Sequence, residues 1–584
     1  MDIFTIITLL GGLAFFLYGM NVLSSGLERM AGGKLETILK KMTSNPFKSL
    51  LLGMGITAAI QSSSAMTVML VGLVNSGIMS LNQTVGVIMG SNIGTTVTAW
   101  ILSLVGIEGD NLFMNLLKPK NFSLLFAFIG ILMIMISKKP KKKDVGAILV
   151  GFAILMFGME TMSGAVKPLA EEPGFQSILT AFKNPILGVA FGAIFTAIIQ
   201  SSSASVGILQ ALAAHGGITF GMAIPIIMGQ NIGTCITSVI SSIGVSRNAK
   251  KVSIVHITFN LIGTAICLSA FCISNAIFDL VFVDTAISPF WIAIVHSIFN
   301  IVTTLLLLPF SKKLVKIANL VLKDKDGDTD TKQKTELLDE RLLVTPSIAI
   351  AECENATNKL ANLAKDALVL AIDTSKNYNE DNVNEVIKLE DTTDKYEDKL
   401  GTYLVKISSK TLSDADSKKV SKMLHAIGDF ERLGDHAVNI VKVAQELHEK
   451  KLKFSDQAQH ELSVLTGALT EILDLTTEAY NNNDVDTAKR VEPLEQVIDQ
   501  LVAAIKAQHI QRLQAGSCSI EMGFILSDLL NNYSRVSDHC SNVAVAIIEI
   551  AHNTFDTHQY LNNVKYSSSS FNDIYENFSA KYYL

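Results

Sequence analysis

The stretch that decides the fold is Gln61-Ser62-Ser63-Ser64-Ala65, which interrupts an otherwise apolar segment at residues 47–77. The same five residues return as Gln200-Ser201-Ser202-Ser203-Ala204 inside a second apolar segment, 186–216. A helix that crosses a bilayer needs about 20 mostly apolar residues, and polar residues within a span are costly unless they find partners or line a cavity. Each segment is therefore either one long helix or a re-entrant hairpin of two half-helices.

The two polar blocks belong to a repeat with a constant offset of 139 residues, the distance from Gln61 to Gln200. With this offset, Gly90-Ser91-Asn92-Ile93-Gly94-Thr95 maps to Gly229-Gln230-Asn231-Ile232-Gly233-Thr234. Asn45-Pro46 maps to Asn184-Pro185 in the same way. No gap is needed from residue 12 to about residue 99, so this part of the chain contains two copies of one module.

Charge divides the chain near residue 311. Residues 1–310 contain 17 Lys and Arg against 11 Asp and Glu, whereas residues 311–584 contain 31 against 43. The first part is apolar and sparsely charged, and the second part is typical of a soluble protein. The acidic second part argues against nucleic-acid binding. The six cysteines include no CxxC pair, so neither a disulfide framework nor a zinc site is indicated.

Basic residues in short loops mark the cytoplasmic side of a membrane protein. Four basic clusters occur, at residues 29–48, 138–143, 247–251 and 312–316. All four can be cytoplasmic only if both interrupted segments enter and leave on the same side. The charge pattern therefore favours re-entrant hairpins and places the C-terminal part in the cytoplasm. The N-terminus has no basic region or cleavage site, so it is interpreted as a retained span. The expected spans are 4–23, 83–104, 121–137, 145–162, 221–244, 252–272 and 288–310.

The charges that flank the two copies differ. Residues 28–48 carry five Lys and Arg, whereas residues 167–187 carry only Lys167 and Lys183. By the charge rule the first loop is inside and the second outside, so the copies are expected to be related by inversion. Secondary transporters often have this plan, with their sites near the midplane at the interface between the repeats.

The polar blocks have the chemistry of an anion and cation site. A helix break at each Gln-Ser-Ser-Ser block would free backbone N–H groups at a half-helix N-terminus, which bind anions together with serine hydroxyls. Freed carbonyls, with the oxygens of the Asn-Ile-Gly-Thr blocks, suit a hard cation such as sodium. Gly94 and Gly233 would permit a close backbone approach or unusual dihedral angles there. Close helix packing is the alternative interpretation for a single Ser-rich segment, but two repeated blocks favour function.

A further pair of motifs recurs in the last spans, where Asn follows His by four residues. His256 and Asn260 share one helix face, as do His296 and Asn300. A hydrogen bond between helices is the favoured interpretation, with gating or a proton relay as the alternative. A hydrolase that uses a serine of the blocks is disfavoured because catalysis needs a base within reach. The nearest candidate base, His215, has Ser76 as its counterpart in the first copy.

The duplicated motifs resemble the type II sodium–phosphate cotransporter family, including its bacterial members, over residues 1 to about 310. The resemblance implies an inverted-repeat fold with re-entrant hairpins in which the blocks and their neighbours bind sodium and phosphate. The two copies are not strictly symmetric, because Cys235 occupies the position that corresponds to Thr96, and Gln230 the position that corresponds to Ser91. The assignment of single oxygens to sodium or to phosphate therefore stays open. The implied binding residues are Gln61, Ser62, Ser63, Ser64, Gln200, Ser201, Ser202, Ser203, Asn92, Thr95, Asn231 and Thr234.

The remaining residues are expected to form a linker (311–337), a helical domain (338–555) and a tail (556–584). Apolar residues at three- and four-residue spacing predict helices. A weaker repeat of about 103–105 residues indicates two three-helix bundles, about 338–448 and 452–555.

Carboxylates four residues apart recur in this helical domain, and two such helix faces could hold a divalent or trivalent metal. A solvated face is the alternative for any single pair. The stretch resembles the PhoU family of phosphate-signalling proteins, which implies such metal motifs. Ser534 stands where Glu431 stands in the first bundle, which argues against a full cluster in the second. The candidate metal ligands are Glu390, Asp394, Glu431, Asp435, Glu495 and Asp499.

The sequence thus predicts an all-α, multi-pass protein of the cell (inner) membrane with inverted repeats at about 4–137 and 145–272, a last span at 288–310, and a cytoplasmic PhoU-like domain. The predicted function is sodium-coupled transport of inorganic phosphate, regulated by that domain, with no catalysis. Phosphate export, transport of another oxyanion, and a phosphate sensor without transport are the alternatives. Further candidate partners are membrane lipid, a phosphate-signalling protein that binds the C-terminal domain, and a second copy of the chain.

Overall fold

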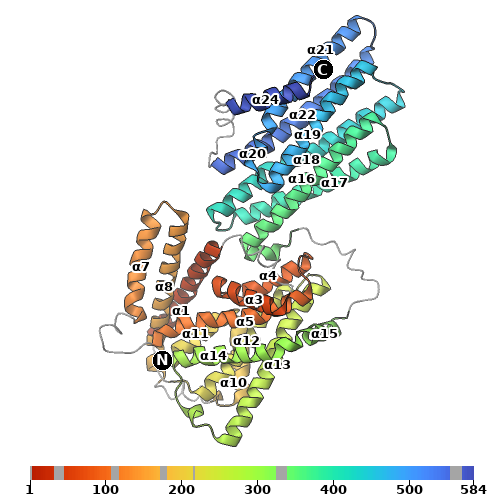
Figure 1. Cartoon of the computed structure of the whole chain (residues 1–584). Coiled ribbons are helices and arrows are strands. Elements are labelled where there is room, and N and C mark those ends of the chain that lie inside the picture. Colours follow the sequence, from red (N-terminus) through yellow and green to blue (C-terminus); the bar gives the residue numbers. More distant parts are fainter. Residues whose placement is uncertain are drawn as a thin grey trace. The chain divides into compact units, whose positions relative to one another are not determined.

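A computed structural model describes residues 3–31, 45–106, 118–170, 181–214, 217–323, 338–552 and 569–584. These residues are nearly all helical, and no β-strand forms among them beyond one isolated bridge between Thr219 and Ala286. The predicted all-α class is confirmed. The chain divides into two compact units (Figure 1), called here the membrane unit, Met1–Ile348, and the C-terminal unit, Ala349–Leu584.

Six helices in the described part of the membrane unit are long and apolar enough to cross a bilayer, and they match six of the seven expected spans. The seventh expected span, 121–137, forms a shorter apolar helix. The elements are α1 (Ile3–Ala31), α3 (Pro46–Ile60), α4 (Ser63–Asn75), α5 (Leu81–Ser103), η1 (Leu104–Gly106), α7 (Pro119–Ile136), α8 (Pro140–Ala170), α10 (Pro185–Ile199), α11 (Ser202–Ala213), α12 (Phe220–Ser241), α13 (Arg247–Phe278), η2 (Val281–Asp284), α14 (Pro289–Leu307), η3 (Leu308–Phe310), α15 (Ser311–Val321) and η4 (Glu340–Val344).

The helices repeat at the same offset as the sequence. The first residues of α3, α4 and α5 each lie 139 positions before the first residues of α10, α11 and α12. Both α3 and α10 begin with the same signal: the side chain of Asn45 or Asn184 accepts a hydrogen bond from the first turn, and proline follows. Asparagine is a favoured N-cap and proline a favoured first helical residue, so identical local chemistry starts each copy.

Helices α1 and α8, which are counterparts in the repeat, pack together through glycines. Gly12 lies against Gly158, and Gly19 lies against Gly151, so the two helices run antiparallel. The two contacts exchange under the 139-residue offset, which is the relation that a two-fold axis produces. A Cβ atom on Gly19 would lie 2.3 Å from the backbone nitrogen of Leu155, so only glycine permits this approach.

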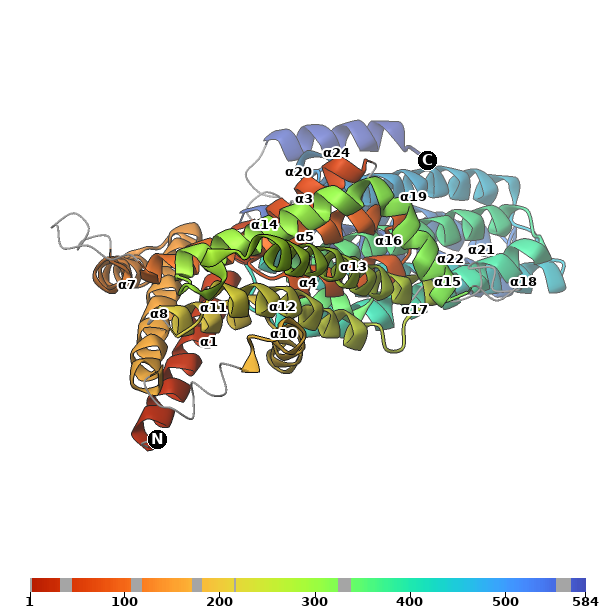
Figure 2. The ribbon, with the colours of Figure 1, turned by 90° about the horizontal axis from the view of Figure 1, so that it is seen from below.

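The half-helices α3 and α10 lie against α5 and α12 respectively (Figure 2). A Cβ atom on Gly90 would lie 1.9 Å from the carbonyl oxygen of Leu50, and one on Gly229 would lie 2.1 Å from that of Val189. Backbone contact this close holds each Asn-Ile-Gly-Thr block beside the half-helix of its own copy.

The start of the expected linker is helical. Residues 311–321 form α15, in which Leu314 and Ala318 are buried one turn apart. These residues belong to the expected linker, and their helix combines three lysines with six apolar residues, Leu314, Val315, Ile317, Ala318, Leu320 and Val321. Residues 324–337 of the expected linker lie outside the described residues.

The described part of the C-terminal unit consists of six long helices and two short ones. Its first three long helices and its second three follow the order expected for two bundles. The elements are α16 (Pro346–Lys376), which begins in the membrane unit, α17 (Glu380–Ser408), α18 (Asp414–Glu449), α19 (Asp456–Asn482), α20 (Val485–Ala488), α21 (Val491–Gln514), α22 (Ile520–His552) and α24 (Ser569–Lys581).

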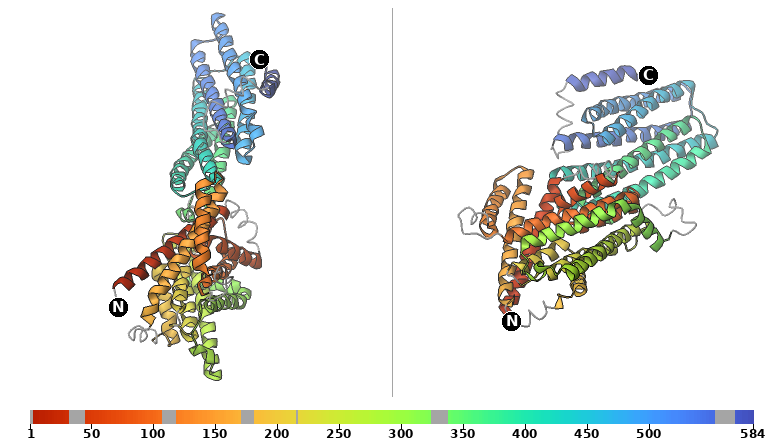
Figure 3. Two further views of the ribbon diagram at one scale, coloured as in Figure 1. Left: turned by 90° about the vertical axis from the view of Figure 1, so that its left-hand side faces the viewer. Right: turned by 60° about the horizontal axis from the view of Figure 1, so that its bottom comes forward.

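The expected tail ends in an ordered helix. Helix α24 lies on the outside of the other helices of its unit (Figure 3). Next to it, the hydroxyl of Tyr582 donates a 2.6 Å hydrogen bond to Glu471, and Lys581 pairs with the same carboxylate at 2.9 Å. Residues 569–581 of the expected tail are therefore helical, whereas 556–568 lie outside the described residues.

Candidate functional site

Both Gln-Ser-Ser-Ser blocks break a helix, as the re-entrant interpretation requires. Gln61 ends α3 in the left-handed region at φ 60°, and Gln200 ends α10 at φ 59°. The next residue reverses to an extended conformation and caps the following helix: the Ser62 hydroxyl accepts from Ala65 N at 3.1 Å and the Ser201 hydroxyl from Ala204 N at 3.2 Å. The chain therefore stops one helix and starts another within two residues in each copy.

The two breaks approach each other in the membrane unit. The Ser64 hydroxyl of the first copy lies 3.4 Å from the Gln200 carbonyl oxygen of the second. Ser63 and Ser202, the first helical residues of α4 and α11, are each only 5% exposed. The N-terminal turns of two half-helices, with their hydroxyls and free N–H groups, thus lie close to a common point.

Gln61 is held by residues outside its block. Its side-chain oxygen accepts a 2.7 Å hydrogen bond from Thr98 of α5, and its side-chain nitrogen donates to Ala58 O at the end of α3. The Ser24 hydroxyl of α1 donates to Ile60 O at the same helix end. Neither Thr98 nor Ser24 is among the binding residues that the sequence predicts. Both recur at the 139-residue offset, as Thr237 and Ser163, but single hydroxyl residues are also common where membrane helices pack closely, so the sequence did not single them out.

The Asn-Ile-Gly-Thr blocks lie inside the unbroken helices α5 and α12, so no backbone carbonyls are freed there. Gly94 and Gly233 have helical conformations and serve close approach instead: an added Cβ atom would lie 2.6 Å from Met54 O and 2.3 Å from Ala193 O. The hydroxyls of Thr95 and Thr234 each donate to the residue four positions earlier in their own helix.

The asparagines of these blocks differ between the copies. Asn92 donates to the side-chain oxygen of Asn260 on α13 at 3.2 Å, and Asn260 donates in turn to the Cys235 sulfur on α12 at 3.3 Å. Asn231 instead donates to Ile227 O within its own helix. Asn260 therefore connects the two copies, as expected for a hydrogen bond between helices.

Of the two histidines in the recurring motif, His256 lies 3.4 Å from the Ser238 hydroxyl. The ring nitrogens of His296 have no hydrogen-bond partner among the described residues. The interhelical interpretation thus fits His256 and does not fit His296.

In the C-terminal unit, carboxylates gather on both bundles. Glu495 and Asp499 of α21 and Asp538 of α22 place one oxygen each within 4.8 Å of the others. The Ser534 hydroxyl donates to Asp499 at 3.1 Å. Asp538 corresponds to Asp435 of the first bundle and supplies the third carboxylate of this group, while Ser534 occupies the place of Glu431, as the sequence indicates.

The first bundle carries Glu390 and Asp394 on α17 and Glu431 and Asp435 on α18. Burial raises the pKa of Glu390, and the neighbouring carboxylates of Asp435 and Asp394 raise it further. Burial and Asp435 likewise raise the pKa of Glu431, although Arg432 opposes the shift. These carboxylates repel one another at neutral pH.

Replacing Glu431 by glutamine should stabilise the C-terminal unit against heat at pH 7 when divalent metals are absent. A carboxyl with a raised pKa costs folded-state stability as the pH rises through that pKa, and glutamine removes this cost. We expect a rise in melting temperature of about 1–2 °C, given partial solvent screening. The rise should vanish toward pH 4, where wild-type Glu431 is protonated. A constant difference at both pH values would contradict the repulsion, and exposed Glu446→Gln is the control.

Family models match both parts of the chain. A model described as Na+/Pi-cotransporter matches residues 15–164 and again 154–288, and a model described as PhoU domain matches residues 357–444 and 463–547. The chain belongs to the Na+/Pi-cotransporter family. The two matches of the first model correspond to the two copies of the repeat, and those of the second model to the two bundles of the C-terminal unit. Members of the family are transporters, so the expectation that the chain is not an enzyme is confirmed.

Three relatives from other organisms match different shares of the chain. YjbB of Salmonella typhimurium, whose name assigns it provisionally to inorganic phosphate export, is 24% identical over 555 residues, which are 93% of this chain and 98% of the relative. YqeW of Bacillus subtilis, an uncharacterized protein, is 31% identical over 53% of this chain and 95% of its own length. The rat sodium-dependent phosphate transport protein 2A is 40% identical over 100 residues, 17% of this chain and 16% of the relative. This Na+/Pi-cotransporter family member is therefore a multi-pass membrane protein of a phosphate-transporting family with a PhoU domain at its C-terminal end.

Proposed function

We propose that the chain couples the movement of inorganic phosphate across the cell membrane to sodium, and that its C-terminal unit regulates this transport from the cytoplasm. The observation that carries the proposal is the approach of the two helix breaks, with Ser64 Oγ 3.4 Å from Gln200 O. Two half-helix N-termini that approach one point inside a membrane unit have the chemistry to bind an anion with several oxygens.

The substrate would lie at the first turns of α4 and α11. Their N–H groups and the hydroxyls of Ser62, Ser63, Ser201 and Ser202 would donate to phosphate oxygens. Helices α4, α10 and α11 contain no charged residue, so no side chain there neutralises a phosphate anion. Sodium ions bound beside the anion would lower the cost of holding it away from water.

The sodium ions would use oxygen ligands from the opposite helix ends. The last carbonyl groups of α3 and α10, with the side chains of Gln61 and Gln200, lie on the other side of each break. Asn92 and Asn231, held beside these ends by glycine contacts, are further candidates. In the proposed cycle the two copies have inverted topology, and their relative movement exposes the site to each side in turn. The antiparallel contact of α1 with α8 supports that relation.

The C-terminal unit would sense phosphate status with the help of a divalent metal. Glu495, Asp499 and Asp538 supply hard oxygen ligands close enough together for one ion. Binding of a cation would relieve their mutual repulsion and tie α21 to α22. Glu390, Asp394, Glu431 and Asp435 form the corresponding candidate in the first bundle.

Phosphate export is the second candidate for the direction of transport. It is favoured by a relative that matches 93% of this chain and is named, provisionally, for export. Phosphate uptake and phosphate export would use the same site. The sign of the sodium gradient would determine whether it drives or opposes the phosphate flux.

Flux of labelled phosphate through proteoliposomes of known orientation tests the proposal. We expect flux to depend on a sodium gradient and to be competed by arsenate more than by sulfate. Equal flux with sodium and with choline would exclude sodium coupling, and flux in only one orientation would decide between uptake and export. Phosphate binding without any flux would leave the sensor as the remaining function.

A further inference from the structure

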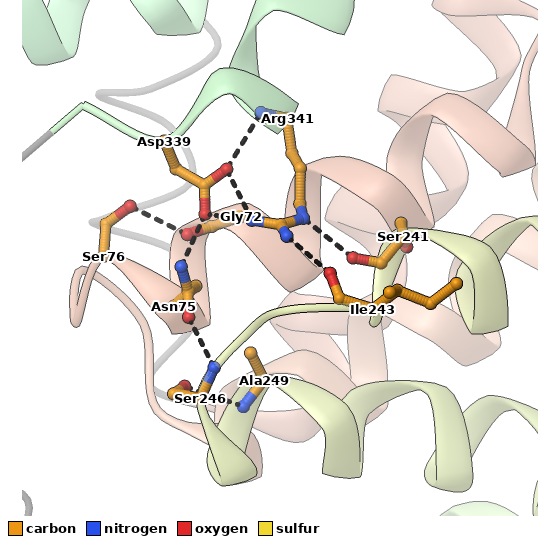
Figure 4. A network of polar contacts seen from close by, with 9 residues as sticks. All are labelled: Gly72, Asn75, Ser76, Ser241, Ile243, Ser246, Ala249, Asp339 and Arg341. Atoms are coloured by element: carbon orange, nitrogen blue, oxygen red, sulfur yellow. Dashed lines mark hydrogen bonds and ion pairs between the residues drawn. The ribbon is translucent and has the colours of Figure 1, made fainter. Parts of the chain in front are cut away.

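A short segment just before the C-terminal unit lies at the ends of three membrane helices. This segment, residues 338–345, contains η4 and is called here the clamp; it belongs to the membrane unit (Figure 4). Asp339 is fully buried within it. The Asp339 carboxylate accepts a 2.7 Å hydrogen bond from the side chain of Asn75, the last residue of α4, and pairs with Arg341 at 2.9 Å. A buried carboxylate is stable only with such partners, so the clamp is a specific contact.

The guanidinium of Arg341 extends from the clamp to the end of α12. Its Nε donates to Ser241 O at 2.7 Å, and one of its terminal nitrogens donates to Ile243 O at 2.9 Å (Figure 4). Carbonyl groups at a helix C-terminus lack helical partners and carry partial negative charge. Arg341 satisfies these carbonyls while it neutralises Asp339, so the Arg341–Asp339 pair joins α12 to Asn75 of α4.

The contact also includes the start of α13. The side-chain oxygen of Asn75 accepts a 2.9 Å hydrogen bond from Ser246 N, which caps α13. Leu342 of the clamp is fully buried, and an added Cβ atom on Gly72 of α4 would lie 2.9 Å from its side chain. Polar and apolar contacts together hold the clamp against the last turn of α4.

The helices that the clamp joins carry the candidate site. Helix α4 runs from Ser63, beside the first break, to Asn75 at the clamp. Helix α12 carries Asn231 of the second copy and ends at the carbonyls that Arg341 binds. Directly after the clamp, Pro346 begins α16, which continues without a break into the C-terminal unit.

We propose that the clamp is an autoinhibitory contact that restrains the movement of α4 relative to α12, and that the C-terminal unit controls transport by pulling on it through α16. This inference rests on the transport function proposed above. With the clamp in place, a helix of the first copy and a helix of the second are tied together on the side of the α12–α13 loop. Release of the clamp frees the two helices and opens the site toward that side, which the basic residues at the start of α13 mark as cytoplasmic.

Accessibility of a cysteine at the first break measures the restraint directly. In full-length Ser64→Cys protein in oriented vesicles, modification of the introduced thiol by a membrane-impermeant reagent from the cytoplasmic side is followed by mass spectrometry of the peptide that contains it. Adding Arg341→Ala removes the bonds to all three partners and should increase the rate at least about tenfold, the effect on an equilibrium constant of losing a single charge-assisted hydrogen bond. Arg341→Lys, which keeps the charge but cannot bind all three partners, should give an intermediate rate.

Two further variants separate a restraint from general damage. Asn75→Ala removes the link to α4 and keeps the Arg341–Asp339 pair, so it should also increase labelling. Lys250→Ala removes a positive charge from the first turn of α13 but none of the clamp bonds described above, so it should leave labelling unchanged. Wild-type rates in both Arg341→Ala and Asn75→Ala would overturn the proposal, as would an equal increase in Lys250→Ala. This readout does not require phosphate flux, so it stands apart from the test of the proposed function.

The role of α16 is tested by inserting four Gly and Ser residues between Thr345 and Pro346. The insertion leaves every residue of the clamp in place, but a flexible tether transmits less tension from the C-terminal unit. The rate at which the thiol of Ser64→Cys is modified should therefore differ from the rate without the insertion. If the insertion leaves labelling unchanged, the clamp acts independently of the C-terminal unit and that half of the proposal is wrong.

Discussion

Replacing Ser63 and Ser202 together by alanine should reduce sodium-dependent phosphate flux by at least about 100-fold. Both hydroxyls lie in the first helical turns beside the two breaks, and both side chains are buried. A hydrogen bond to a charged group contributes about 1.5–3 kcal/mol, and about 1.4 kcal/mol corresponds to a factor of ten. Each single substitution should therefore cost about tenfold or more. Flux in oriented proteoliposomes, normalised to the amount of inserted protein, measures the effect.

The matched control is Ser103→Ala. Ser103 is also buried in the membrane unit, but its hydroxyl donates to Trp100 O in its own helix. Its replacement should leave flux within about twofold, since it removes only a local bond. Wild-type flux in the double variant would show that the two half-helix N-termini do not belong to the substrate site. An equal loss in Ser103→Ala would indicate that any buried serine affects folding.

Replacing Glu461 by alanine should destabilise the C-terminal unit by about 3–5 kcal/mol. Glu461 of α19 and Arg512 of α21 form a two-bonded ion pair at 2.6 and 2.9 Å, and their side chains are only 3% and 10% exposed. Removal of the carboxylate leaves a buried guanidinium without its counter-charge, which is the costly outcome. The melting temperature of this unit should fall by about 10 °C.

Hydrogen exchange of the α19 and α21 amides in the full-length protein measures this loss without interference from the membrane helices. Replacement of Glu446, an exposed partner of Lys450, should change protection by less than about 0.5 kcal/mol. The double variant Glu461→Met with Arg512→Met should recover much of the stability, because a buried pair is often replaceable by apolar side chains. A stability loss as small as that of Glu446→Ala would contradict the burial of the pair.

The sequence predicted the helix breaks because each Gln-Ser-Ser-Ser block combines a long apolar context with polar residues that have no helical partner. The constant offset then required both copies to behave alike, and the matching left-handed Gln61 and Gln200 confirm it. The paired carboxylates were found in the same way, since Glu495 and Asp499 are four residues apart on one helix. These features depend on residues close in sequence, and so they can be read without a structure.

Contacts between distant residues could not be read in this way. Thr98 is one of many threonines in α5 until the fold places it 2.7 Å from Gln61. The backbone role of Gly94 was ambiguous because glycine serves equally for a bend and for close approach. Nothing in the sequence distinguishes Asp339 and Arg341 from other charged residues after the expected linker. Only the fold shows that Asp339 is buried and that the pair contacts helices 264 and 100 residues away.

The short length of the half-helices has an electrical consequence. Helices α3 and α10 contain 15 residues each, about 22 Å at about 1.5 Å per residue, whereas the hydrocarbon core of a bilayer is about 30 Å thick. In the proposed cycle each break would therefore lie within the hydrocarbon core, and ions that move through it would cross the membrane voltage. Each elementary charge that crosses the whole membrane would gain or lose about 2.3 kcal/mol per 100 mV. Any imbalance between sodium and phosphate charge would thus make the turnover voltage-dependent.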